Sequence, residues 1–505
     1  GQKPSNNPRV KRTITMALVA LELPAGIYNH GTELDSSGRW RDGNFIRWQN
    51  GSVRPIGGWT TRKATATAAA PRGAVAWSDH SQANHIAVGT YNKLYALNQG
   101  SAVSDITPTG LTAGTVDADA NYGFGGLTYG NAAYGTSRDG VVPENVTTWS
   151  LDNFGQYLIA CSSADGKIYQ WQLNGAVIAA VLSNAPTGNK AMMVTDERFV
   201  FALATGGNPQ KIAWSDRENN NLWAPAVTNQ AGDIELQTTG EIMCGVRVKG
   251  SALILTNLDA HSATYAGPPF VYSFSRVGTS CGVVSRQAAI AVDEGAFWMG
   301  TNAFYQYNGA SVQEMPCEVA DHVFTDLNQA QRSKVCAIHN SQFGEVWWFY
   351  PSGSSMENDR YVVYDYKEGH WNIGALARTT GVDLGAFRSP LWFDASGNLY
   401  NHEFGYSHSS APYLESGPIS LGGGDKIVKV NEIIPDEGTQ GEVSLTFKTR
   451  FYPNGEESSH GPYTLGNPTG ARFQGRQIRM LINGSELNDW RAGKMRLNVI
   501  EGGRR

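Results

Sequence analysis

The stretch EVWWFY at residues 345–350, followed by YVVYDY at residues 361–366, decides the fold of this chain. It is one copy of a phrase in which a strongly apolar segment precedes a polar turn and a second segment of alternating aromatic residues. Further copies begin with HIAVGT, YLIACS, GAFWMGT and PLWFD, at residues 85–90, 157–162, 295–301 and 390–394. The β-branched and aromatic content of each copy predicts strands, and such self-similarity is the signature of a repeat architecture.

The spacing of the repeats predicts their type. The strongest strand of each unit begins near residues 85, 157, 199, 252, 296, 346 and 391. All intervals but the first are 42 to 53 residues long, close to the ~40–50 residues of a four-stranded propeller blade. The first interval of 72 residues contains a Gly/Tyr-rich stretch at 121–140, which would be an extra loop or an irregular blade. We therefore predict an all-β chain with a propeller of six or seven blades, some irregular, over residues 71–405.

The residues outside the repeats predict three further regions. Residues 1–20 are expected to be an N-terminal arm, because residues 1–15 are too polar and basic to fold alone; they would be disordered or would order against a neighbouring subunit. Residues 21–70, with Gly and Asn between short apolar runs, predict a β-hairpin and interface region. Residues 406–505, with period-two alternation, predict a C-terminal β-sandwich. Helical spacing of apolar residues within 317–328 predicts one short helix between blades.

Composition limits the classes of function. A net charge of −5 excludes a generally basic nucleic-acid binder. No apolar run approaches the ~18–20 residues that span a bilayer, so we expect no membrane insertion. The cysteines are scattered, odd in number and without C-x-x-C spacing, which predicts isolated core thiols in a reducing compartment. These cysteines are Cys161, Cys244, Cys281, Cys317 and Cys336.

Motifs for catalysis are weak. The sequence GTSCG at residues 278–282 matches G-x-S-x-G, but a strand, not a helix, is predicted after it, which favours a turn between blades over a nucleophile elbow. The sequence DADANYG at residues 117–123 imitates the start of a calcium loop with its glycine one place late and favours a solvated turn. There is no H-E-x-x-H, paired Cys/His site or phosphate loop. We therefore predict no catalytic residue, no cofactor and no metal, and a protein that is not an enzyme.

Two Arg-rich stretches, at residues 39–54 and near the C-terminus, are the candidates for an interface. They would form solvated sheet faces and packed hairpins, or they would contact an acidic protein surface or passing DNA. The candidate subunit or adaptor interface consists of Arg39, Trp40, Arg41, Arg47, Trp48, Arg54, Arg476, Arg479 and Arg491.

Two segments resemble a known family. Residues 23–59 contain LPAGIY, GRWRDGNFIRW and RPIGGW, and residues 278–309 contain GTSCG, FWMG and FYQYNG. Both are similar to tail proteins of short-tailed bacteriophages, the nozzle or tail tubular protein B, also described as a packaged-DNA stabilisation or tail hub protein. The resemblance implies a homohexameric ring in the virion tail, assembled after synthesis in the host cytoplasm. Its implied partners are portal and adaptor proteins, tail fibre or spike proteins and, transiently, double-stranded DNA, with no small-molecule substrate.

The residues leave two other functions open. Aromatic-rich loops would also suit a carbohydrate-binding or depolymerising propeller that acts as a receptor-binding protein. A cellular propeller scaffold would instead bind a peptide partner. The size of the protein in solution distinguishes these functions, because a hexamer favours the nozzle and a monomer or trimer that binds or clears a polysaccharide favours the receptor-binding protein.

Overall fold

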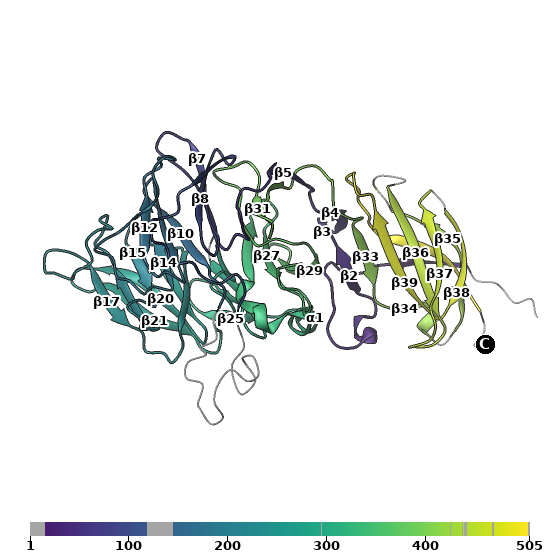
Figure 1. Cartoon of the computed structure of the whole chain (residues 1–505). Helices are drawn as coiled ribbons and strands as arrows, with labels where there is room; N and C mark the ends of the chain where they lie inside the picture. Colours follow the sequence, from purple (N-terminus) through teal and green to yellow (C-terminus); the bar gives the residue numbers. More distant parts are fainter. Residues whose placement is uncertain are drawn as a thin grey trace, which may run out of the picture. The chain divides into compact units, whose positions relative to one another are not determined.

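The computed structural model describes residues 16–118, 145–293, 295–424, 426–436, 438, 442–466 and 469–502. Within these residues the chain is almost entirely β and forms two compact units. The propeller unit is Gly57–Phe404, and the sandwich unit combines the described residues up to Ile56 with those from Gly405 onward. In Figure 1 most strands of the propeller unit are blue to green, whereas the sandwich unit combines purple strands from the start of the chain with green to yellow strands from its end.

The described part of the propeller unit contains seven four-stranded antiparallel sheets, each of which is one blade. Blade 1 is β6 (Ala74–Ser78), β7 (Asn84–Gly89), β8 (Leu94–Asn98) and β9 (Ala102–Asp105). Blade 2 is β10 (Trp149–Phe154), β11 (Tyr157–Ser162), β12 (Ile168–Trp171) and β13 (Ala180–Val181). Blade 3 is β14 (Ala191–Val194), β15 (Val200–Leu203), β16 (Lys211–Trp214) and β17 (Gly232–Glu235). Blade 4 is β18 (Ile242–Val248), β19 (Ser251–Thr256), β20 (Ala260–Gly267) and β21 (Val271–Gly278).

The remaining blades complete the ring. Blade 5 is β22 (Ala289–Val292), β23 (Gly295–Met299), β24 (Phe304–Tyr307) and β25 (Val312–Met315). Blade 6 is β26 (Cys336–Asn340), β27 (Glu345–Tyr350), β28 (Arg360–Asp365) and β29 (His370–Ala375). Blade 7 is β30 (Thr380–Val382), β31 (Leu391–Phe393), β32 (Leu399–His402) and β5 (Trp59–Lys63). The first strand of each blade contacts the first strand of the next, and β30 contacts β6, so the ring closes.

The repeat predicted from sequence is the second strand of each blade, from β7 to β31. The strand EVWWFY shows why these segments are apolar throughout. Neighbouring residues of a strand point to opposite faces, so Trp348 packs on Phe304 of blade 5 at 5.0 Å and Trp347 packs on Trp392 of blade 7 at 5.2 Å between ring centroids. A blade buried on both faces has no polar side, and the propeller prediction, with seven blades, is confirmed.

Two further details of the propeller agree with the sequence analysis, and one boundary does not. The predicted helix is α1 (Ala320–Asp326), and a 3-10 helix, η2 (Gln329–Lys334), follows it between blades 5 and 6. The long first interval falls in the connection from β9 to β10, of which residues 119–144 lie outside the described residues. The prediction of a separate region over 21–70 is wrong at its end, because β5 pairs with β32 and supplies the fourth strand of blade 7.

The sandwich unit has two facing sheets, as predicted for the C-terminal region. The first is β1 (Met16–Leu21), β40 (Met495–Glu501), β35 (Val428–Ile434) and β38 (Thr469–Gly475), in that order. The second is β2 (Trp40–Asn44), β33 (Tyr413–Ser416), β39 (Gln477–Gly484), β36 (Val443–Arg450) and β37 (Ser458–Thr464), with β34 (Ile419–Ser420) also paired to β39. A hairpin of β3 (Ile46–Gln49) and β4 (Ser52–Pro55) and two 3-10 turns, η1 (Glu33–Ser36) and η3 (Leu421–Gly424), complete the unit.

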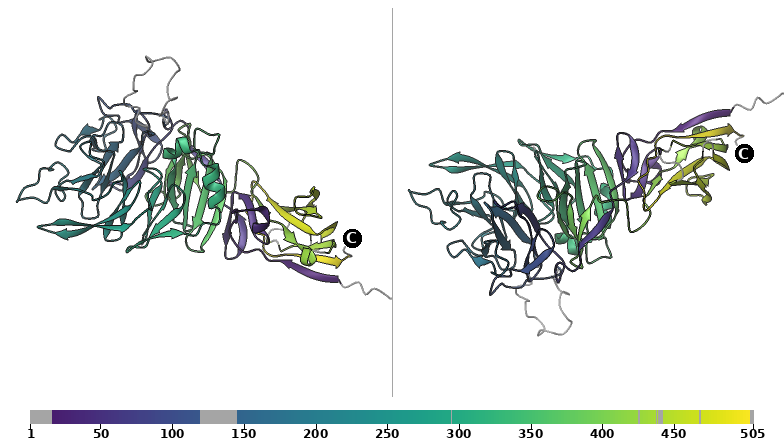
Figure 2. Two further views of the ribbon diagram at one scale, coloured as in Figure 1. Left: turned by 90° about the horizontal axis from the view of Figure 1, so that it is seen from below. Right: turned by 90° about the horizontal axis from the view of Figure 1, so that it is seen from above.

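Burial alternates along the sandwich strands, and the rings of Phe447 and Phe473 stack between the two sheets at 4.9 Å. The N-terminal segment belongs to this unit. Strand β1 lies at the edge of the first sheet and β2 at the edge of the second, so the predicted arm and hairpin region are in part strands of the sandwich. The prediction that residues 406–505 form the sandwich by themselves is therefore incomplete. The two views of Figure 2 show β1 beside the C-terminal strands.

Candidate functional sites

The centre of the propeller ring is crossed by the side chain of Gln287. This residue lies just before β22 of blade 5, and its Nε2 donates to the carbonyl oxygens of Arg72 and, at 3.1 Å, of Trp149. Those carbonyls lie at the start of blades 1 and 2, opposite blade 5 in the ring. Gly73 permits this approach, since a Cβ there would lie 2.4 Å from the Trp149 oxygen. The side chain of Gln287 therefore joins opposite blades by hydrogen bonds across the axis of the ring.

A cluster of ion pairs with buried cations connects blade 1 to blade 6. The side chain of Lys334 is fully buried. Its Nζ binds Asp117 at 2.5 Å, Glu357 at 3.1 Å and the carbonyl oxygen of Met356. Arg72 donates to both oxygens of Glu357, at 2.6 and 2.7 Å. Two cations therefore face two carboxylates, and the charges of the cluster balance. Buried ions are tolerated only when they are paired in this way.

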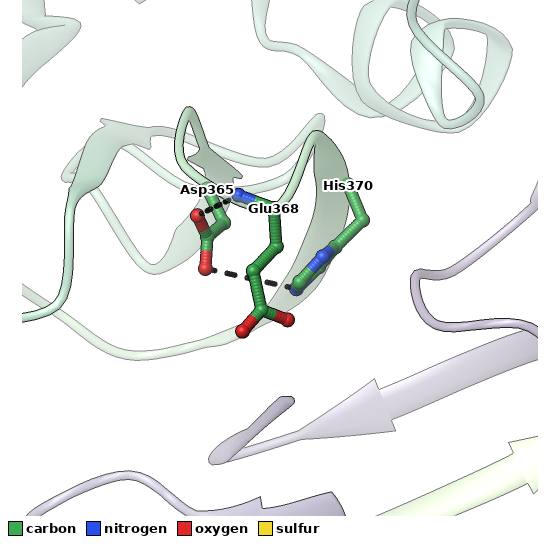
Figure 3. Close-up of side chains that lie close together, drawn as sticks. All are labelled: Asp365, Glu368 and His370. Carbon is green, nitrogen blue, oxygen red and sulfur yellow. Dashed lines mark hydrogen bonds and ion pairs between the residues drawn. The ribbon is translucent and has the colours of Figure 1, made fainter. Parts of the chain in front are cut away.

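A second candidate site is the turn between β28 and β29, where Asp365, Glu368 and His370 bring their ligand atoms within 4.8 Å of one another. Figure 3 shows the three side chains around this turn. Asp365 accepts the backbone N–H groups of Lys367 and Glu368 at 2.9 Å each, and its other oxygen lies 4.0 Å from Nε2 of His370. These backbone hydrogen bonds account for the arrangement as a capped hairpin turn, so we assign no metal.

The G-x-S-x-G sequence forms the connection from blade 4 to blade 5, as predicted, and the next element is strand β22. Its glycines have packing roles. A Cβ at Gly278 would lie 2.7 Å from Val312, and one at Gly282 would lie 2.0 Å from the carbonyl oxygen of Asn257. The motif is therefore explained by close backbone contact, and no base lies within hydrogen-bond distance of Ser280 in the part of the chain that the structure describes.

Blade 7 contains a buried cation without a carboxylate partner in direct contact among the described residues. Arg378 is 4% exposed, donates from Nε to Nε2 of His402 at 3.0 Å, and lies 4.4 Å from the ring centre of Tyr400. His402 stacks on Trp392 at 4.0 Å, and burial together with the charge of Arg378 holds its pKa well below the usual range. A neutral His402 is the hydrogen-bond acceptor that this guanidinium needs.

Three of the predicted interface residues are buried. Trp40, Arg47 and Trp48 are 5%, 2% and 4% exposed. Buried side chains cannot belong to an exposed docking surface, so this part of the prediction is wrong. Apolar and basic residues that alternate in sequence do not separate a packed hairpin from an exposed one, and the tertiary structure decides in favour of packing.

The other predicted interface residues have partners within the sandwich unit. Arg39 lies over the ring of Tyr28 at 5.3 Å and Arg476 over that of Tyr452 at 5.0 Å. Arg41 donates to the carbonyl oxygen of Thr32, and Arg54 pairs with Asp489 at 3.1 Å. Arg491 is exposed, and its carbonyl oxygen accepts the N–H of Gly438.

Arg479 belongs to a network of ions on the second sheet. It binds Glu415 at 2.6 Å and both Glu33 and Glu457 at 3.1 Å. Arg450 shares Glu33 at 2.8 Å. The carboxylates already pair with these guanidinium groups, so Arg450 and Arg479 offer little unpaired positive charge to a partner. Only the exposed residues among the predicted interface residues therefore remain candidates for an interface.

The thiols behave as core residues. Burial raises the pKa of Cys161, Cys244 and Cys336 to about 12 and that of Cys281 to about 11. A thiol is nucleophilic only as the thiolate, so these cysteines are unsuited to catalysis. Within the described residues, no helix is long and apolar enough to cross a membrane.

Sequence analysis did not single out Gln287, Lys334, Arg378 or His402. One pattern does relate two of the axial residues: Arg72 and Gln287 both stand just before the first strand of a blade. An alignment of the residues that precede the first strand of each blade is therefore the sequence signal for these axial positions. Nothing in the sequence relates Lys334 to Asp117, which are 217 positions apart.

No protein-family model matches the chain, and neither does any curated protein. Several solved structures are similar to it. A virginiamycin B lyase from Staphylococcus aureus has a TM-score of 0.42 at 7% identity and covers 68% of this chain and 98% of its own. YCF48 bound to D1 peptide has a TM-score of 0.39 at 8% identity, covering 70% and 100%. The Neurospora crassa Pan2 WD40 domain has a TM-score of 0.39 at 10% identity, covering 70% and 95%.

Proposed function

We propose that this chain is a non-enzymatic structural subunit that assembles as a ring in the tail of a short-tailed bacteriophage, where the ring continues the DNA channel. Six copies are expected from the family that its sequence resembles. The ring would retain packaged DNA and pass it during ejection. Adaptor and portal proteins on one side and tail fibre or spike proteins on the other are its expected partners.

The observation that carries the proposal is the closed centre of the propeller. The Gln287 bridge and the balanced cluster around Lys334 occupy the place where a propeller would hold a ligand or substrate. The charged groups pair with one another and, among the described residues, leave no activated nucleophile or base there. A propeller filled in this way acts as a rigid body, and a passage for DNA would lie between copies of the chain.

The charge of each unit is consistent with this role. Residues 57–404 contain 30 Asp and Glu against 20 Lys and Arg, whereas residues 1–56 and 405–505 together contain 15 against 20. An acidic propeller repels the phosphate backbone, so a wall built from it would let DNA slide. The more basic sandwich unit is better suited to contact acidic surfaces.

Native mass spectrometry and electron microscopy of the purified chain test the proposal. We expect a closed ring of six copies, alone or after addition of the adaptor protein, and an acidic bore that binds DNA weakly at physiological salt. A monomer or trimer that cleaves or clears a capsular polysaccharide would contradict the proposal and support the receptor-binding alternative.

A further inference from the structure

Strand β1 (Met16–Leu21) is an apolar edge strand. It pairs with β40 in unbroken register from Met16↔Ile500 to Leu21↔Met495, and among the described residues its other edge has no backbone partner. Its sequence MALVAL contains no charged residue and no proline, and the strand has no bulge. Soluble proteins normally protect such an edge with a lysine, a proline or a bulge, because an open apolar edge pairs with another strand.

A cavity of about 230 Å³ opens beside this edge, between the two sheets of the sandwich unit. Val19 and Leu21 of β1, Val428 and Val499 of the same sheet, and Ile419 and Leu421 from the opposite side line it. An apolar cavity of about 150 Å³ already holds a benzene molecule. The opening can therefore accept two aliphatic side chains from a strand added next to β1, which would complete the core.

The charged residues around the cavity indicate the amino-acid composition of a strand that would pair with β1. Glu22 and Glu501 lie at its rim, and their lysine partners are on the exposed surface, where an ion pair is weak and exchangeable. A basic strand with two apolar residues on one face would fit. Within this chain, residues 9–15, with the sequence RVKRTIT, have that composition.

In an extended strand Val10 and Ile14 lie on the same face. Arg12 falls between them, and its long side chain can leave the cavity to reach Glu22 or Glu501. Residues 1–15 contain four basic residues and no acidic one. They precede β1 directly, so they cannot fold back as its neighbour without a turn, whereas a second copy can receive them.

We propose that residues 9–15 of one copy pair with the outer edge of β1 of a neighbouring copy and fill its cavity with Val10 and Ile14. This inference rests on the proposed function in that the neighbours are subunits of the ring. Residues 9–15 continue directly into β1, and seven extended residues span up to about 25 Å, so the two copies must lie side by side with their β1 strands close together. An arm that each copy donates to the next is a heterologous contact, the type that closes rings.

The test compares the association of four proteins by sedimentation velocity: the full chain, a variant lacking residues 1–15, Ala17→Lys and Gln474→Lys. Ala17 is exposed and lines the cavity, so a lysine there protects the edge and repels the basic arm. Gln474 is equally exposed on β38, at the opposite edge of the same sheet, and is the matched control. The first two changes should weaken association by roughly tenfold or more, and Gln474→Lys should leave it unchanged. Circular dichroism checks that each variant is folded.

A second measurement identifies the contact itself. Equal amounts of ¹⁴N- and ¹⁵N-labelled chain are mixed and treated with a zero-length carboxyl–amine cross-linker. A mixed-isotope link from Lys11 to Glu22 or Glu501 supports the proposal. A link found within single copies alone, or association that is unchanged by loss of residues 1–15, overturns it.

The outcomes separate this inference from the proposed function. A hexamer that is insensitive to both variants overturns the arm and leaves the ring intact. A dimer or trimer that contains the mixed link supports the arm and contradicts the hexameric ring. A chain that stays monomeric at every concentration overturns both.

Discussion

Individual residues hold the propeller together at its axis and in its last blade. Gln287 bonds to opposite blades, and Arg72 and Lys334 share the carboxylate of Glu357. The contacts of Gln287 with Trp149 and of Arg72 with Glu357 join residues 138 and 285 positions apart, so a single substitution there acts on more than one blade. The removal of one partner from a buried ion cluster leaves the other charge unpaired, which costs more than the bond itself.

Glu357→Gln should therefore destabilise the propeller by about 2–3 kcal/mol, because Arg72 then loses its ion-pair partner and Lys334 keeps only Asp117 and the carbonyl oxygen of Met356. Chemical denaturation measures the change in free energy of unfolding. Glu314→Gln, at an exposed position of β25, is the control and should change stability by less than about 0.5 kcal/mol. Equal effects of the two substitutions would show that the axial cluster contributes little.

The stability of blade 7 should depend on pH through His402. Its pKa is depressed in the folded protein, so below about pH 6.5 the unfolded chain binds a proton that the folded chain does not. The contribution of His402 to stability is then complete above about pH 6.5 and falls as the pH decreases, by at most about 2 kcal/mol at pH 5. His402→Gln keeps an acceptor for Arg378 but does not titrate. Its unfolding free energy should vary less between pH 7 and pH 5, and a variation as steep as that of the original chain would refute the role of His402.

At the scale of elements, β5 differs from the other outermost strands because it closes the ring. It comes from residues 59–63 and pairs with β32, whereas every other blade within the described residues is built from one continuous stretch. An ordinary outermost strand can detach and leave its blade in place. Strand β5 cannot detach without removing the link between the start and the end of the propeller.

The double substitution Thr60→Pro/Thr61→Pro should lower the free energy of unfolding by about 3 kcal/mol or more, because one of two neighbouring N–H groups must face β32. Ala180→Pro/Val181→Pro makes the same change in β13, the exposed outermost strand of blade 2, and should cost less than half as much. Thermal unfolding followed by circular dichroism gives both values. If the two pairs are equally costly, closure by β5 is not a special source of stability.

At the scale of the whole molecule, the propeller is an insertion within the sandwich. The ends of the insertion lie together, since Phe404 donates its N–H to the carbonyl oxygen of Gly58 at 3.0 Å. The sandwich residues on either side also lie together, because Nε2 of His408 is 2.9 Å from the carbonyl oxygen of Ile56. Each unit is thus compact by itself.

We expect residues 57–404 to fold as a separate protein, and residues 16–56 joined to 405–502 by a short Gly/Ser linker to fold as a sandwich. Each should unfold in one cooperative transition by calorimetry, and the intact chain should show two. Aggregation of either piece, with the loss of its β signal by circular dichroism, would show that the units depend on each other.

The sequence by itself determined the repeat, the strand content and the position of seven blade strands. It could do so because both faces of these strands are buried and every residue between 345 and 350 must be compatible with the core. It also placed the short helix and the turn at 278–282, whose residues act locally. These features depend on neighbours within a few positions, which a pattern can record.

Only the tertiary structure decided which distant residues meet. Strand β5 pairs with β32, Lys334 meets Asp117, and β1 joins β40 almost 500 residues away, because ring closure and sandwich pairing bring the chain ends to segments far along the sequence. It also separated the buried Trp40, Arg47 and Trp48 from exposed arginines of the same pattern. Alternation fixes which residues share a face, but the element that covers that face is set by long-range packing.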